Sequence, residues 1–298
     1  MTDYQRPLSF GLSLDPDARA WAHTRRLART AENLGLDHLA VQDHPYQPGH
    51  FDAWTLISHL SAHTDRISFL TDVADLQLRP PVMLAKAATS LSVLTGGRIR
   101  LGVGGGGIPD AIASMGGAAR RGPDLVAFAD ESVGLLRKAL NGDSVRLHSP
   151  YHHIAGYQAG PVPTQPVELW LGAQKPRMLA VTGRQADGWI SPLNIYVTPD
   201  EVPSRQEIID EAATGAGRDP RELRRVYNVI GAIGGGDGPG LVGDVRRWVD
   251  TLTEWTVVLG FDTFVLWPAA DPERQLALFA GEVVPAVRER VEAIRSGR

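Results

Sequence analysis

The chain has 298 residues with a net charge of -4, and 43% of them are hydrophobic and 21% charged. It contains no cysteine, which excludes disulfides, thiolate nucleophiles and cysteine-based metal centres. No excess of basic residues favours nucleic acid, no apolar run approaches the roughly 20 residues of a membrane span, and MTDYQRPLSF does not resemble a secretory signal, so we expect a cytoplasmic protein.

Short runs with strand composition alternate with longer stretches of helical period from residue 8 almost to the end. In the first part, the predicted strands are 8–14, 38–42, 66–74 and 98–103, and the predicted helices are 17–34, 53–62 and 81–94. Gly35 supplies the stop signal of the first helix. After a predicted helix at 124–140 and a hairpin within 145–154, the strands are 167–172, 186–191, 226–233 and 262–268, and the helices are 176–185, 200–213, 242–259 and a last one to about 294.

Eight strands alternating with helices predict an α/β fold, a (β/α)8 TIM barrel with an insertion after the fourth strand and a hairpin excursion before the fifth. No linker or change of composition divides the chain, so residues 1–298 are interpreted as one domain. An open, doubly wound sheet is the alternative. Both architectures bind ligands at the carboxyl ends of the strands, so candidate residues are sought there.

The stretch VQDHPYQPGH follows the second predicted strand and contains Asp43, His44, Tyr46 and His50. A histidine titrates near neutrality and serves as a general acid or base. The alternative is that Asp43 caps a turn and His44 is solvated. The third strand ends in TDVAD, where Asp72 and Asp75 interrupt an apolar run; a carboxylate there requires a ligand, a partner or water.

The stretch LGVGGGGIPDAIASMGG, residues 101–117, fits the dinucleotide pattern GxGxxG at Gly102, Gly104 and Gly107, but Pro109 and the later glycines argue against the immediate helix that this pattern needs. Consecutive glycines also let a backbone pass close to a flat or phosphorylated ligand. A flexible turn is the alternative reading.

The stretch VELWLGAQKPRML leads from a strand into a helix. A helix N-terminus favours an anion, and the cations there, Lys175 and Arg177, predict a phosphate site rather than helix stabilisation. A solvated basic turn is the alternative.

The remaining candidates carry weaker signals. Tyr227 and Asn228 in the seventh strand and Trp267 in the eighth could line a pocket or pack in the core. The hairpin histidines, His148, His152 and His153, lack metal-binding spacing and are interpreted as surface residues, so no metal site is predicted. The loop at 234–240 is glycine-rich enough for a mobile lid or a plain linker.

With these residues in view, the chain resembles the luciferase-like monooxygenase superfamily of flavin- and deazaflavin-dependent enzymes, nearest to those that depend on coenzyme F420. The likeness runs through AVQDHPY, the stretch SFLTDVADLQLRPPVMLAKAATSLSVLTGGRIRLGVGGGG, and ELWLGAQKPRMLAVTGRQADGWI. It implies a barrel with an insertion, a cofactor lying across the carboxyl ends of the strands, and a homodimer.

The resemblance also implies roles for individual residues. His44 matches the histidine that donates or accepts a proton beside the reactive ring, and Asp43 is its companion. Asp72 and Val73 match a site that often carries a non-prolyl cis peptide supporting the ring. The loops beside the cofactor and around its phosphate are matched by Gly104, Gly105, Gly106, Gly172, Ala173, Gln174, Lys175, Pro176 and Arg177.

Two departures bear on the substrate. F420-dependent sugar-phosphate dehydrogenases carry an aromatic residue a few positions after the histidine and a glutamate in the fourth-strand loop, whereas here Pro45, Tyr46 and Gln47 follow His44 and Gly107 replaces the glutamate. Asp110 stands where an amide is usual. These differences argue against oxidation of a sugar phosphate.

The leading hypothesis is an F420-dependent oxidoreductase that transfers a hydride to or from a small organic substrate, with Tyr46, Asp110, Tyr227, Asn228 and Trp267 in the substrate pocket. The alternatives are an FMN-dependent monooxygenase that uses reduced flavin and O2, a metal-dependent barrel hydrolase, and a cofactor-binding protein without catalysis.

Overall fold

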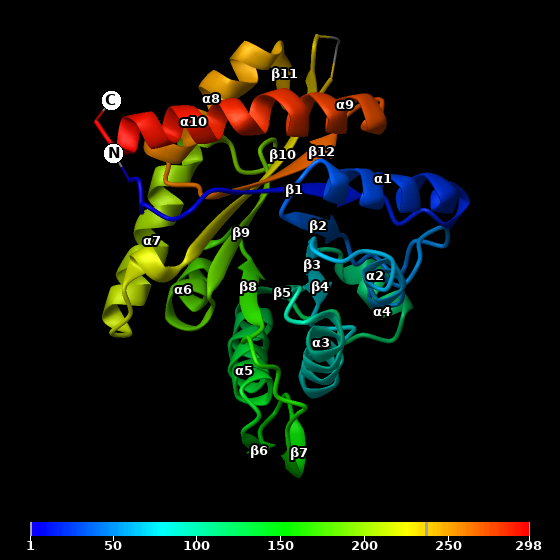
Figure 1. The fold of residues 1–298 in the computed structure, drawn as a ribbon. Coiled ribbons are helices and arrows are strands. Elements are labelled where there is room, and N and C mark those ends of the chain that lie inside the picture. Colours follow the sequence, from blue (N-terminus) through cyan, green and yellow to red (C-terminus); the bar gives the residue numbers. More distant parts are fainter. Residues whose placement is uncertain (1, 236–237, 298) are drawn as a thin grey trace.

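Eight parallel strands close into a barrel in the computed structural model, which describes residues 2–235 and 238–297 (Figure 1). The barrel strands are β1 (Ser9–Leu14), β2 (His38–Val41), β3 (Ser68–Thr71), β5 (Ile99–Gly104), β8 (Glu168–Gly172), β9 (Gly188–Leu193), β10 (Arg224–Ile233) and β12 (Thr263–Pro268). They pair in chain order, and β12 closes the ring by pairing with β1. The predicted TIM barrel is confirmed, and the alternative of an open sheet is wrong.

Helices surround the barrel (Figure 1). They are α1 (Trp21–Asn33), α2 (Ala53–Ser61), α3 (Pro81–Thr95), α5 (Gly122–Leu140), α6 (Pro176–Gln185), α7 (Val202–Gly215), α8 (Val245–Val257), α9 (Pro272–Leu278), the π-helical turn η4 (Phe279–Val283) and α10 (Val284–Arg295). Short 3-10 turns are η1 (Ala18–Ala20), η2 (Pro199–Glu201) and η3 (Pro220–Glu222). No helix within the described ranges is long and apolar enough to cross a bilayer.

The predicted insertion lies between β5 and β8. It contains the short helix α4 (Pro109–Ser114), helix α5, and a hairpin of β6 (Ser144–His148) and β7 (His153–Gln158) that projects from the barrel beyond α5 (Figure 1). The hairpin is confirmed. The expectation that no helix follows the glycines was wrong, because proline is tolerated in the first turn of a helix, where its missing N–H costs no hydrogen bond.

Several predicted boundaries differ from the structure. The third predicted strand is divided into β3 and the two-residue β4 (Ala74–Asp75) by the turn at Asp72 and Val73. Val242, predicted as helical, lies in the short strand β11 (Leu241–Gly243). The predicted lid at 234–240 includes residues 236–237, which lie outside the described residues.

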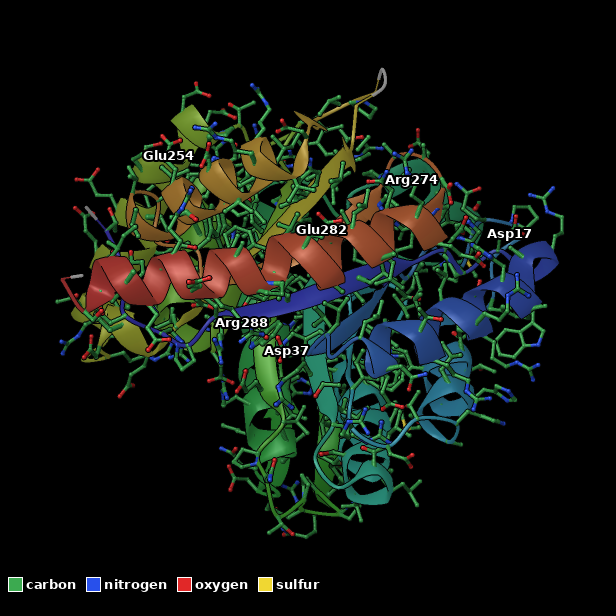
Figure 2. The ribbon with its side chains drawn as sticks, turned by 45° about the horizontal axis from the view of Figure 1, so that its top comes forward. Asp17, Asp37, Glu254, Arg274, Glu282 and Arg288 are labelled. Atoms are coloured by element: carbon green, nitrogen blue, oxygen red, sulfur yellow. The ribbon has the colours of Figure 1, made fainter. Side chains whose placement is uncertain are left out.

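Local signals determine where helices begin and end. Gly35 adopts a left-handed conformation with φ of 80°, as its predicted position after α1 requires. Asp52 caps α2 by accepting a hydrogen bond from the backbone N–H of Thr55 at 2.9 Å. Helix α10 is tied to the barrel by Arg288, whose guanidinium lies 2.8 Å from the carboxylate of Asp37 (Figure 2).

Two apolar clusters form the core. The larger one lies between the strands and the helices. The smaller one fills the barrel interior, because its buried members come from six different strands: Ala40, Leu70, Trp170, Ile190, Val226 and Val265. This interior plug separates the two mouths of the barrel. Val73 and Trp267 pack against this plug and extend the apolar cluster to the carboxyl ends of the strands.

Candidate functional site

A cavity of about 710 Å³ opens at the carboxyl ends of the barrel strands. Most predicted site residues line it: Asp43, His44, Tyr46, Asp72, Val73, Gly104, Gly105, Gly106, Gly172, Ala173, Gln174, Lys175, Asn228 and Trp267. They come from segments far apart in the sequence, which meet because parallel strands end at the same mouth of a closed barrel.

His44 lies half-buried in the turn after β2, with its ring stacked on Tyr46 at 5.4 Å between ring centroids. Burial lowers its pKa, His50 lowers it further, and the carboxylate of Asp43 only partly opposes both. The ring is therefore neutral at neutral pH and can accept a proton or donate its N–H. The pKa of Tyr46 is raised by burial and by Asp75 and Asp43, so its hydroxyl stays protonated.

Asp43 lines the same cavity, but Arg79 occupies both of its carboxylate oxygens. Nε and Nη2 of Arg79 donate to them at 2.6 and 2.7 Å, and the backbone N–H of Asp75 adds a longer hydrogen bond of 3.4 Å. A second carboxylate, Asp52, accepts from Arg79 at 2.5 Å. Burial alone would lower the pKa of Arg79, but the two carboxylates raise it above its ordinary value. Asp43 thus anchors the turn that carries His44.

Asp72 is held by a chain of side-chain hydrogen bonds that crosses the barrel mouth. The indole N–H of Trp267 donates to Oδ1 of Asn228 at 3.0 Å, and Nδ2 of Asn228 donates to Oδ1 of Asp72 at 3.2 Å. Nδ2 of Asn228 also donates to the carbonyl of Ser191 at 3.3 Å. Because Trp267 fixes which end of the amide is the acceptor, Asn228 presents a donor to Asp72.

The second oxygen of Asp72, Oδ2, is buried and has no hydrogen-bond partner within the described part of the chain. Burial raises the pKa of this carboxyl to about 6, and the hydrogen bond from Asn228 only partly opposes that rise. A buried carboxyl that changes protonation near neutrality, with one oxygen unsatisfied at a cavity wall, is suited to a hydrogen bond with a ligand.

The peptide bond between Asp72 and Val73 is cis. Val73 lies against the glycine loop: a Cβ on Gly104 would lie 2.7 Å from Cγ2 of Val73, and one on Gly172 would lie 3.1 Å from its Cγ1. A side chain at position 104 would therefore collide with Val73, and one at position 172 would be tightly packed against it. Gly106 has φ of 93°, a left-handed backbone conformation that favours glycine at this position.

The predicted phosphate loop ends at the N-terminus of α6. Gly172 closes β8, and Ala173, Gln174 and the exposed Lys175 line the cavity before the helix begins at Pro176. Among the described residues no side chain caps this end of α6, so its first backbone N–H groups have no side-chain acceptor. Pro176 and Arg177 do not line the cavity.

Two further predicted residues lie away from the cavity. Tyr227 is buried outside the barrel, stacked on Phe261 at 4.3 Å between centroids, and its hydroxyl donates to the carbonyl of Val197 at 2.6 Å. Asp110 lies on α4 with a side chain 97% exposed and pairs with Arg121 at 2.8 Å. Neither is a lining residue of the cavity.

Sequence reasoning left out several lining residues: Gln42, Leu125, Ile190, Pro192, Leu193 and Tyr196. Asp75 and Gly107, which the sequence singled out without a site role, also line the cavity. Tyr196 follows the sixth barrel strand, so its position after a strand was an available signal. Leu125 comes from α5 and carries no such signal, because it reaches the cavity only through the folding of the insertion.

The hairpin histidines do not lie at this cavity. Nδ1 of His148 and Nδ1 of His153 lie 2.5 Å apart across the hairpin, whereas His152 is half-buried, stacked on Phe128, and bonded to Ser132 at 2.9 Å. His152 thus differs from the predicted surface residue. Among the described residues, no group of three or more histidine, cysteine or acidic side chains is arranged to hold a metal ion.

Comparisons with known sequences identify relatives. The sequence model of the luciferase-like monooxygenase family matches residues 8–236. Phthiodiolone/phenolphthiodiolone dimycocerosates ketoreductase of Mycobacterium tuberculosis is 32% identical over 206 residues, which are 66% of this chain and 51% of the relative. An uncharacterized protein of the same organism is 31% identical over 186 residues, 55% of this chain and 63% of the relative. The chain thus spans about half the length of the ketoreductase.

Solved structures share the fold across nearly the whole chain. The F420-dependent tetrahydromethanopterin reductase of Methanopyrus kandleri has a TM-score of 0.80 at 18% identity, covering 94% of this chain and 99% of that one. An F420-dependent secondary alcohol dehydrogenase has a TM-score of 0.84 at 17% identity, with 95% and 99% covered. EDTA monooxygenase from Chelativorans sp. BNC1 has 0.82 at 15%, with 96% and 94% covered. On its sequence match and its barrel, this chain belongs to the luciferase-like monooxygenase family.

Proposed function

We propose that this protein is an oxidoreductase that binds the deazaflavin F420 across the carboxyl ends of the strands and transfers a hydride between it and a small organic substrate. One observation carries the proposal: a single cavity brings together a neutral histidine, a buried carboxyl with an unsatisfied oxygen, and Lys175, the residue directly before the uncapped helix α6. A proton-handling residue and an anion site in one cavity are what a phosphate-bearing ring cofactor requires.

The residues present fit such a cofactor. Val73, Ile190 and Leu193 give the cavity apolar walls for a flat ring, while the glycine backbone at Gly104 and Gly105 has no Cβ to keep a ring away. Asp72, whose Oδ2 has no partner among the described residues, also lines the cavity and offers a hydrogen bond. When bound, F420 supplies the carbon that gives or takes the hydride.

His44 handles the proton in this proposal. Its neutral ring can accept the proton of a hydroxyl when an alcohol is oxidised, and in the reduction of a carbonyl the protonated ring returns that proton to the oxygen. The ion pair of Asp43 with Arg79 holds the turn that carries it, and stacking on Tyr46 limits its rotation. Asp72, fixed by Asn228, is a second group in the cavity that can hold a proton near neutrality.

We propose ketones and secondary alcohols as the substrate class. The relative at 32% identity is named a ketoreductase, which supports interconversion of a carbonyl and an alcohol. A cavity of about 710 Å³ has the size of a small-molecule site. The metal-dependent hydrolase is disfavoured, because within residues 2–235 and 238–297 no cluster of three potential metal ligands is present.

The test is a fluorescence titration of the cofactor-free protein with F420 and, separately, with FMN. We expect saturable binding of F420 and much weaker binding of FMN. Tight binding of FMN with none of F420 contradicts the proposal and favours the FMN-dependent monooxygenase. Reduction of a panel of ketones by reduced F420, followed through the absorbance of the cofactor, then tests the substrate class.

A further inference from the structure

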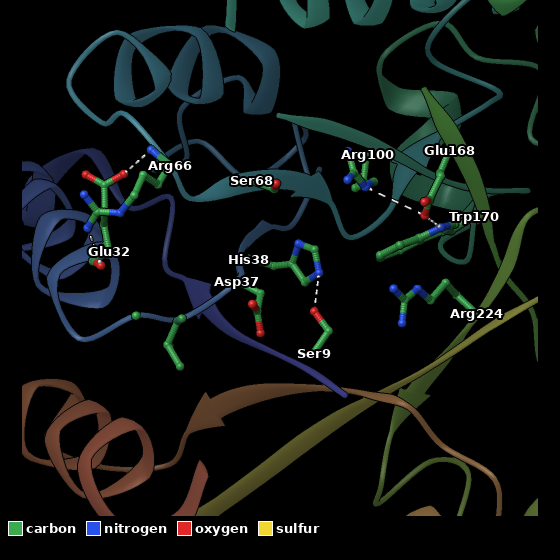
Figure 3. A pocket seen from close by; sticks show the side chains of 12 residues that line it. Ser9, Glu32, Asp37, His38, Arg66, Ser68, Arg100, Glu168, Trp170 and Arg224 are labelled. Atoms are coloured by element: carbon green, nitrogen blue, oxygen red, sulfur yellow. Dashed lines mark hydrogen bonds and ion pairs between the residues drawn. The ribbon is translucent and has the colours of Figure 1, made fainter. Parts of the chain in front are cut away.

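A second cavity, of about 360 Å³, opens at the opposite mouth of the barrel, where the strands begin. Its walls come from the first residues of several strands and from the loop after α1 (Figure 3). Trp170, a member of the interior plug, lines it, whereas Ile190 of the same plug lines the upper cavity. The two cavities are therefore separate sites on opposite sides of the plug.

His38, the first residue of β2, is buried at this lower mouth with only 8% of its surface exposed. Its Nε2 lies 2.7 Å from the hydroxyl of Ser9, and in the tautomer in which Nε2 accepts from this hydroxyl, Nδ1 carries the N–H of the ring. Its Nδ1 is buried and finds no hydrogen-bond partner in the described residues. Burial lowers the pKa of His38 to about 3, and Arg100 and Arg224 lower it too, so the ring is neutral. A buried ring nitrogen without a partner is costly unless a ligand or water satisfies it.

Arg100 and Arg224 lie with Glu168 and Trp170 on one side of His38, and Arg66 and Glu32 lie on the other side (Figure 3). Within the described ranges, hydrogen bonds engage Arg100 and Arg224 only through Nη1: that of Arg100 donates to backbone carbonyls, and that of Arg224 donates to the carbonyl of Pro7 and to Asp262. Each guanidinium retains further donors at a wall of the cavity.

The ion pairs at this side of the mouth are long or shared. Glu168 accepts from the indole N–H of Trp170 at 2.9 Å and makes a longer contact of 3.7 Å with Nε of Arg100, and Asp262 is shared between Arg224 at 3.1 Å and Arg6 at 3.7 Å. On this side of His38, the cavity wall therefore carries the guanidinium groups of Arg100 and Arg224 and one lining carboxylate, Glu168. The other acids of the cavity are already engaged: Glu32 accepts from three backbone N–H groups, and Asp37 pairs with Arg288.

From this geometry we propose that the lower mouth is a binding site for a small oxyanion, a phosphate or a carboxylate, held by Arg100 and Arg224 and by the free ring nitrogen of His38. Free guanidinium donors, with two guanidinium groups beside one lining carboxylate, select an acceptor-rich, anionic ligand. The site is independent of the proposed redox function, because the plug separates it from the upper cavity.

The test follows the ring nitrogens of His38 by 15N NMR in the full chain while inorganic phosphate, and in a second series citrate, is added at constant ionic strength. We use the Lys175→Gln variant as the background, so that anions at the upper cavity do not contribute. The expected result is a saturable shift of the His38 resonances with at least one of the two anions. The anion that binds more tightly distinguishes a phosphate ligand from a carboxylate ligand.

Arg100→Gln and Arg224→Gln should each weaken this binding about tenfold or more, as the loss of one charge-assisted hydrogen bond predicts. Arg66→Gln is the matched control, because Arg66 lies at the far side of the same cavity, and it should leave the affinity unchanged. Two results overturn the proposal: no saturable shift of His38 with either anion, or binding that Arg66→Gln weakens as much as Arg100→Gln and Arg224→Gln do. The first result depends on no variant at the lower mouth, so a destabilised variant cannot obscure it.

Discussion

Arg79 donates from Nε and Nη2 to the two oxygens of Asp43, at 2.6 and 2.7 Å, and so ties the turn after β2 to the segment that leads into α3. The side chain of Asp43 is only 1% exposed, and Arg79 is its counter-charge. Of the two aspartates that Arg79 binds, Asp43 is the one beside His44, and the ion pair therefore determines where the histidine lies.

Replacing this arginine tests how much the pair contributes. Arg79→Gln leaves a buried carboxylate without its counter-charge, so we expect the free energy of unfolding to fall by about 3 kcal/mol in urea titrations. Arg121→Gln is the control: it removes an exposed ion pair with Asp110 and should cost less than about 1 kcal/mol. Equal losses in the two variants would contradict a structural role for the buried pair.

Asp72→Asn should change how stability depends on pH. Burial raises the pKa of Asp72 from 3.8 to about 6, so between these values the folded protein holds a proton that the unfolded chain has released. The native protein therefore loses stability as the pH rises through this window, and asparagine, which stays neutral, avoids that loss. Above pH 6 we expect the variant to be more stable by about 2 to 3 kcal/mol.

The measurement is a series of urea titrations from pH 4 to pH 8. Asp110→Asn is the control, because that carboxylate is almost fully exposed and its removal should leave the pH dependence unchanged. A variant Asp72→Asn whose stability follows the native curve at every pH would show that Asp72 does not titrate in this window.

His44→Ala should reduce turnover by at least about 100-fold while sparing cofactor affinity, because the loss of a general acid or base affects the chemical step. The measurements are steady-state kinetics and fluorescence titration with the cofactor. Unchanged turnover would remove His44 from catalysis, and a parallel loss of cofactor affinity would make it a binding residue instead.

The pKa of His44 gives a separate test that needs no substrate. The charge of His50 lowers the pKa of His44, so His50→Gln should raise it towards its ordinary value. NMR titration of the His44 ring in both proteins measures the shift. In the native protein the lowered pKa keeps the ring of His44 neutral down to acid pH. In the variant, where this pKa is higher, the ring becomes protonated at a higher pH, so the acid limb of the activity profile for alcohol oxidation should move to higher pH. A profile with an unchanged acid limb would separate His44 from the rate-limiting proton transfer.

The sequence predicted the barrel and most of the cavity through one physical rule. Parallel strands of a closed barrel end at one mouth, so residues directly after strands, such as Asp72, meet there with inward-facing strand residues, such as Asn228, which is 156 positions away. The rule does not say which way a strand residue points. Tyr227 and Asn228 are neighbours, and because alternate residues face opposite sides of a strand, only one could enter the barrel. Tyr227 points out of the barrel, where it is buried and stacked on Phe261, and Asn228 points in.

The sequence also could not predict which residues that are far apart in the chain contact each other. Arg79 lies in the predicted loop before a helix, and nothing local connects it with Asp43; the contact exists because β2 and β3 are adjacent strands of the barrel. The same limit applies to Arg177, which was predicted from its charge and its place at the start of a helix. The cavity wall ends at Lys175, the last residue before α6, and the helix that begins at Pro176 carries Arg177 away from it.

This difference between two neighbouring cations yields the last prediction. Lys175 lines the cavity directly before the N-terminus of α6 and Arg177 does not, although both are exposed and both are positive. If the cofactor phosphate binds at this helix end, Lys175→Gln should weaken F420 binding by about tenfold at low salt, since it removes a charge-assisted hydrogen bond. Arg177→Gln removes the same net charge and should leave the affinity unchanged.

Fluorescence titrations at low and high ionic strength measure both variants, and the difference between them should shrink as salt screens the charge of Lys175. Equal weakening in the two variants would mean that the anion responds only to the general field of this surface, and the phosphate loop would then have to be sought elsewhere on the barrel mouth.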